Sequence, residues 1–68
     1  MYKIGDKVKL TPIRFRDFAG SQGVVDPNRI YRIYKIIPED NGVYLDGIIN
    51  QQHDYSHVVK IKKPTVIL

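Results

Sequence analysis

Histidine, aspartate and serine, which often carry hydrolytic or metal chemistry, lie together in residues 53–57, HDYSH. On a helix, His53 and His57 would share a face and could hold zinc. The segment is too short and polar to predict a stable helix, and the spacing places no third ligand. We therefore predict no metal site and interpret both histidines as solvated loop residues.

The same segment does not predict an enzyme. Triad residues usually come from distant segments and work inside a cleft that shields them. A chain of 68 residues forms one domain with a thin core, which leaves little room for such a cleft. The sequence has no cysteine, so thiolate metal sites and cysteine nucleophiles are excluded. We predict a non-enzymatic protein without a cofactor.

Residues 13–23, IRFRDFAGSQG, place two arginines and two phenylalanines in a segment that otherwise resembles a long loop. Pro12 lacks a backbone N–H and is expected to break the preceding strand. On an extended arm Ile13 and Phe15 would share one face, so Phe15 is predicted to cover an open end of the core.

The rest of that arm is the predicted contact surface. Phe18 would lie at the tip, where the body of a small domain cannot reach it. Arg14 and Arg16 would flank it as a rim suited to an acidic or phosphate-bearing partner. Tyr55, just before the last predicted strand, is the further partner-binding candidate among the tyrosines.

A second candidate surface is basic. Eleven Lys and Arg against seven Asp and Glu give a net charge of +4, which favours nucleic acid or an acidic protein as partner. The cations predicted to form one stripe along the first and last strands are Lys7, Lys9, Lys60, Lys62 and Lys63. An ordinary solvated, lysine-rich sheet edge is the alternative interpretation.

Strand patterns dominate the chain. Five short strands are predicted, within residues 6–10, 21–25, 30–37, 43–49 and 58–61, with turns at DPNR, NG and DG. Residues 30–37, IYRIYKII, have apolar residues at both odd and even positions, so both faces of this strand are apolar. Such a strand should lie centrally or bend partway. We predict an all-β, small five-stranded barrel with a short helical turn before the last core strand.

IGDKVKL, GSQGVV (a G-x-x-G-x-V stretch), the NG hairpin and HVVKI together resemble SH3-like barrels over residues 3–62. The likeness is to KOW-type modules of translation and transcription proteins, and to small stand-alone SH3-like proteins of bacteria and their phages. It implies that the first and last strands are neighbours and that the long first loop helps to form a peptide groove. It implies a scaffold and does not fix a function.

The predicted organisation is a single domain, residues 1–68, with residues 63–68 as an apolar tail that adds an edge strand or pairs across a dimer. The start is charged throughout and no apolar run is long enough for a membrane helix, so a cytoplasmic location is expected. The leading hypothesis is a module that binds a protein with an acidic or extended segment. The alternatives are binding of RNA or single-stranded DNA, accessory to translation, transcription or phage replication, and a small structural part of a phage.

Overall fold

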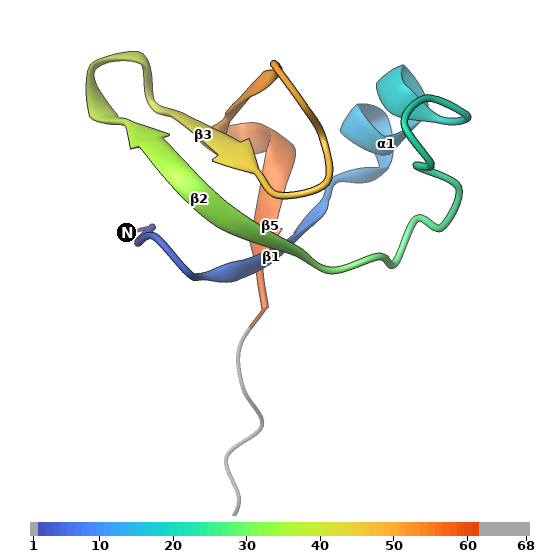
Figure 1. Ribbon diagram of the computed structural model, residues 1–68, viewed down its shortest axis with the longest axis horizontal. Coiled ribbons are helices and arrows are strands. Elements are labelled where there is room, and N and C mark those ends of the chain that lie inside the picture. The colour runs from blue at the N-terminus through green and yellow to red at the C-terminus, as the bar shows by residue number, and fades with distance from the viewer. Residues whose placement is uncertain (1, 62–68) are drawn as a thin grey trace, which may run out of the picture.

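The computed structural model describes residues 2–61, which form a five-stranded antiparallel sheet with one short α-helix (Figure 1). The elements are β1 (Lys7–Leu10), α1 (Pro12–Phe18), β2 (Tyr31–Ile37), the 3-10 turn η1 (Pro38–Asp40), β3 (Gly42–Leu45), β4 (Gln52–Asp54), the 3-10 turn η2 (Tyr55–His57) and β5 (Val58–Lys60). The sheet order is β4-β3-β2-β1-β5. The prediction of an all-β barrel is therefore confirmed only in part: residues 2–61 are mostly β with five strands, but they include a helix, and the sheet does not close into a barrel.

The central strand β2 contains a bulge, which brings apolar residues from odd and even positions of the strand to the same core. Ile33 and Lys35 oppose successive residues of β3, so Tyr34 is the extra residue between them. A one-residue shift turns the following side chains to the other face of a strand. Ile36 therefore packs against the same core as Ile33, although one is at an even and the other at an odd position of the strand. The prediction of a central or bent strand is confirmed on both counts.

The segment after β1 is a helix, and the predicted extended arm is wrong. The side chain of Thr11 accepts a hydrogen bond from the backbone N–H of Arg14 at 3.3 Å, and Pro12 occupies the first turn. A threonine cap followed by proline is a favourable helix start. Because α1 has only seven residues, it is too short to show a sustained helical period in the sequence.

The long segment between α1 and β2 is irregular, so the strand predicted at residues 21–25 is not formed. Only Val24 is buried there, whereas Val25 is 75% exposed. Gln22 connects this loop to the turn before β4, because its Oε1 atom accepts a hydrogen bond from the backbone N–H of Ile49 at 2.7 Å. The loop is therefore packed against the body of the domain.

The predicted turns are confirmed. Asp26 accepts hydrogen bonds from the backbone N–H groups of Asn28 and Arg29, which closes the DPNR turn. Asn41 adopts the left-handed conformation at the end of the β2–β3 hairpin, and Gly47 turns the chain after β3 with φ +107°. The short helical turn predicted before the last core strand is η2.

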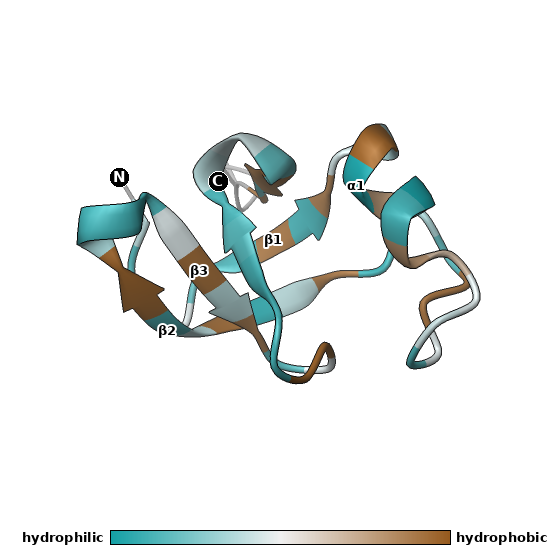
Figure 2. Cartoon of the chain, turned by 90° about the horizontal axis from the view of Figure 1, so that it is seen from above, coloured by the Kyte–Doolittle hydropathy of each residue, from teal (hydrophilic) through white to brown (hydrophobic). Residues whose placement is uncertain are grey.

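The core lies on one face of the curved sheet and includes Val24 and Ile48 from the loops. Hydrophilic and hydrophobic residues alternate along β1 (Figure 2), and the two hydrophobic ones, Val8 and Leu10, are buried as predicted. The buried apolar residues are Val8, Leu10, Val24, Tyr31, Ile33, Val43, Leu45, Ile48 and Val58. His53 is also fully buried, so its interpretation as a solvated loop residue is wrong.

Some predictions fall outside this region. Lys62, Lys63 and the apolar tail of residues 63–68, with the dimer it was suggested to form, lie outside the described residues. Within residues 2–61, no helix has the length and apolar character needed to cross a membrane.

Candidate binding groove beside the helix

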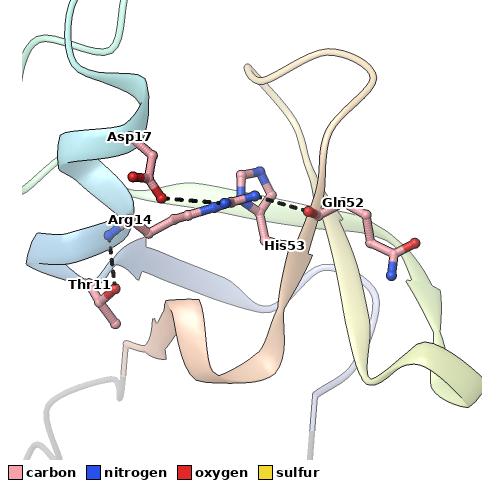
Figure 3. A network of polar contacts seen from close by, with 5 residues as sticks. All are labelled: Thr11, Arg14, Asp17, Gln52 and His53. Atoms are coloured by element: carbon pink, nitrogen blue, oxygen red, sulfur yellow. Dashed lines mark hydrogen bonds and ion pairs between the residues drawn. The ribbon is translucent and has the colours of Figure 1, made fainter.

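One arginine fixes α1 to the sheet. Arg14 extends from the helix across to β4, where its Nε donates a hydrogen bond to His53 Nδ1 at 3.0 Å and its Nη2 donates to the carbonyl oxygen of Gln52 at 3.0 Å (Figure 3). Its Nη1 lies 3.5 Å from Asp17 Oδ2 on the next helical turn. The guanidinium is thus held on three sides, and only 16% of the Arg14 side chain is exposed.

This contact defines the protonation state of His53. A guanidinium can only donate, so His53 Nδ1 must accept, and the neutral ring carries its proton on Nε2. Burial, followed by the charges of Arg14 and His57, lowers the pKa of His53 to about 4. Within the described part of the chain, Nε2 is buried without a hydrogen-bond partner. A protonated His53 would lose the Arg14 bond and add a second cation beside it.

Phe18 completes this contact and is not an exposed tip residue. Its ring centroid lies 5.4 Å from that of His53, and the guanidinium carbon of Arg14 lies 4.7 Å above its ring. Arg14 and Phe18 are four residues apart, so both project from the side of α1 that faces β4. The predicted roles of these two residues as a free contact surface are therefore not supported by their positions.

The other side of α1 borders a groove. Pro12, Phe15, Arg16 and Ala19 have the i, i+3, i+4, i+7 spacing that places side chains on one helical face. All four line a depression of about 390 Å³, together with Lys9, Leu10, Thr11, Pro27, Asn28 and Val59. The groove thus lies between α1, the ends of β1 and β5, and the DPNR turn. Phe15, predicted as a structural lid, lines this groove and also packs against the core.

The groove combines an apolar floor with a cationic border. The apolar residues that line it include Pro12, Phe15, Ala19, Pro27 and Val59, and Val59 is 44% exposed although it lies in a strand; Leu10 also borders the groove but is only 4% exposed. Lys9 and Arg16 contribute the positive charges. Concave apolar surfaces with a few charged groups are typical of sites that bind side chains of a ligand. Of the four predicted partner-binding residues, Arg16 alone lines this groove.

Tyr55 lies elsewhere. The carboxylate of Asp54 accepts a hydrogen bond from the backbone N–H of Ser56 at 2.9 Å, which caps η2 and lowers the pKa of Asp54. Tyr55, at the start of that turn, packs against Tyr2 with ring centroids 5.0 Å apart. The hydroxyl of Tyr2 in turn donates to the carbonyl oxygen of Val58 at 3.2 Å. This pair joins the N-terminal segment to the start of β5.

The predicted lysine stripe is divided between the two faces of the sheet. Lys9 directly opposes Val59, whereas Lys60 opposes Val8, whose side chain points into the core. Opposed residues of an antiparallel pair share a face, so Lys60 lies on the other face from Lys7 and Lys9. Lys60 also forms an ion pair with Asp6, with Nζ 3.3 Å from Oδ2.

The two histidines do not form a metal site with other residues of the described region. His53 lies on β4 and His57 in η2, and no group of three or more potential ligand side chains is found among residues 2–61.

The sequence contained a signal for the groove. Thr11-Pro12 is a helix start, and a helix that begins there places Pro12, Phe15, Arg16 and Ala19 on the face that lines the groove. No local pattern indicates that Val59 and the DPNR turn also line the groove, because their positions there depend on how the strands and the loop pack.

No family model matches this chain, and neither a curated protein nor a solved structure was found to be similar to it.

Proposed function

We propose that this chain is a non-enzymatic, cytoplasmic protein-interaction module on an SH3-like scaffold, and that it binds a short protein segment in the groove beside α1. The observation that carries the proposal is the apolar groove of about 390 Å³ with Lys9 and Arg16 among its lining residues. The pairing of β1 with β5 and the 3-10 turn before β5 support the SH3-like scaffold.

The groove selects the chemistry of its ligand. Pro12, Phe15 and Val59 favour one or two apolar side chains, because burial of apolar area drives the association. Lys9 and Arg16 favour an acidic residue next to those side chains, since opposite charges at a rim select partners and speed the encounter. The expected ligand is therefore a segment with an apolar centre and an acidic flank.

Selection of random dodecapeptides displayed on phage against the immobilised protein tests this proposal. Enriched peptides should share an apolar centre with an acidic flank. Ala19→Arg should weaken their binding at least tenfold, measured by fluorescence polarisation, because the new side chain would fill the groove. Ile13→Arg is the matched control, since Ile13 is 67% exposed on the same helix and does not line the groove.

Two results would contradict the proposal. One is a selection that enriches no common apolar and acidic pattern. The other is an equal loss of affinity in both variants, since a groove ligand must distinguish residue 19 from residue 13. Binding through the apolar floor should also persist at high salt, where exposed ion pairs are screened.

A further inference from the structure

The sheet has an outer face opposite the core, and its composition follows from the strand register. Val8 of β1 is fully buried, so Lys7 before it points outward. Lys7 directly opposes Arg32 of β2, and therefore both cations lie on the outer face. Like charges in directly opposed positions destabilise a sheet, so this pair does not add to the stability of the fold.

The bulge in β2 adds two aromatic rings to that face. After the bulge, Lys35 opposes Tyr44 of β3, whose neighbours Val43 and Leu45 are fully buried, so Lys35 and Tyr44 point outward. The extra residue, Tyr34, is 49% exposed, and its ring centroid lies 6.1 Å from that of Tyr44. Lys35 Nζ lies 5.5 Å from the centroid of Tyr44. Without the bulge, Lys35 would point into the core.

Two of the outer cations, Lys7 and Arg32, border a depression of about 310 Å³ at the β1 end of this face. Lys7, Arg29 and Arg32 line it, together with one carboxylate, that of Asp46. The guanidinium carbon of Arg29 lies 4.9 Å from the ring centroid of Tyr31. Among the described residues, none of the three cations forms an ion pair. Three cations and one carboxylate leave a local excess of positive charge for an anion.

We propose that this outer face, formed by Lys7, Arg32, Tyr34, Lys35 and Tyr44, binds single-stranded nucleic acid. Phosphates lie at the Lys7–Arg32 pair and at Lys35, while unpaired bases stack on the two tyrosine rings. Cations that follow a backbone and aromatic rings that stack on bases are the two elements of single-strand binding. Tyr34 lies two residues from Arg32, about 6–7 Å along the strand, so one short segment can contact both.

This site is separate from the groove beside α1 and involves another class of partner. The rings favour a nucleic acid over an acidic protein, because carboxylates need only the cations and make no use of stacking faces. They favour single strands over a duplex, whose bases are already stacked within the helix. The site also differs from the predicted lysine stripe, because it shares only Lys7 with it and adds Arg32, Lys35 and the two tyrosines.

Fluorescence anisotropy with a labelled 20-nucleotide oligothymidylate tests this inference on the full chain. The log of the association constant should fall with log salt at a slope of about −2, since three neutralised phosphates, one each at Lys7, Arg32 and Lys35, contribute about −0.7 apiece. Arg32→Ala should reduce that slope by about 0.7. Tyr34→Ala should weaken binding about 5- to 100-fold, as loss of one stacking ring does, whereas Tyr34→Phe should preserve it.

Controls separate this site from general charge and from the groove. Arg16→Ala removes the same charge from α1 and should leave oligothymidylate binding unchanged beyond the small effect of net charge, while weakening the peptides selected for the groove. Arg32→Ala should weaken oligothymidylate binding and leave the affinity for the selected peptides unchanged. Thermal unfolding of each variant establishes that it is folded.

The inference is overturned by no binding at 50 mM salt, by equal affinity of Tyr34→Ala and Tyr34→Phe, or by duplex DNA or heparin binding as tightly as oligothymidylate. The last result would mean a general polyanion surface. Failure of the peptide selection together with success here would reject the groove and retain the nucleic-acid site.

Discussion

Acid should destabilise this protein through His53, in a pH range that is set by its environment. The native pKa is about 4 against 6.5 for an exposed histidine, so the unfolded chain binds a proton that the folded chain does not. His53 therefore stabilises the fold fully above pH 6.5, and this contribution is lost as the pH falls toward 4.

The magnitude follows from the two pKa values. At about 1.36 kcal/mol per pH unit, the free energy of unfolding should fall by about 1.4 kcal/mol between neutral pH and pH 5.5. By pH 4.5 the loss should reach about 2.5 kcal/mol, with a limit of about 3.4 kcal/mol. The lowered pKa values of Asp6 and Asp54, whose ordinary value is 3.8, add their losses only below about pH 4.

Urea denaturation of the wild type, His53→Gln and His57→Gln at pH 7.5, 6.5, 5.5 and 4.5 measures this dependence. His53→Gln should be less stable at pH 7.5, yet its stability should change little down to pH 4.5. His57→Gln should keep a pH dependence in this range but a weaker one, because it removes one of the charges that lower the pKa of His53. An equal slope in the wild type and His53→Gln over this range would refute the assignment of the proton to His53.

Three further predictions concern the helix and one turn. Arg14→Ala should lower the free energy of unfolding by about 2 kcal/mol in urea denaturation, because it leaves His53 Nδ1 without its donor. Phe18→Ala should cost about 2–3 kcal/mol in the same assay and Phe15→Ala less, while Phe15→Ala should cause the greater loss of peptide affinity in fluorescence polarisation. Gly47→Ala should lower stability by about 1–2 kcal/mol by thermal unfolding, since φ is +107° and the new Cβ would lie 2.9 Å from an arginine Nη2. Gly5→Ala has a similar φ but open space around it, so it should cost less.

Features carried by local patterns were predictable from the sequence. Val8 and Leu10 alternate with lysines, DPNR contains its own turn chemistry, and IYRIYKII has the composition of a central strand. These three patterns were enough to predict β1, the turn before β2 and β2 itself, because each element depends on residues close together in the chain.

The candidate site was harder to predict, because the role of each ring depends on the period of a seven-residue segment. With the two-residue period of a strand, Phe15 faces inward and Phe18 reaches outward. With the helical period, Phe18 shares a face with Arg14 and meets the sheet. The burial of His53 was missed for a related reason, since its partner lies on an element 39 positions away in the sequence.

The strand order also has a consequence for how the chain folds. β2, β3 and β4 pair with their neighbours along the chain within residues 31–54, whereas β1 pairs with β5 through Leu10 and Val58. Contacts between distant residues form more slowly, because a long loop must be closed before they are gained. The meander from β2 to β4 should therefore form first, and closure of β1 against β5 should limit the folding rate. In pulse-labelled hydrogen exchange during refolding, amides of β2 and β3 should gain protection before those of β5.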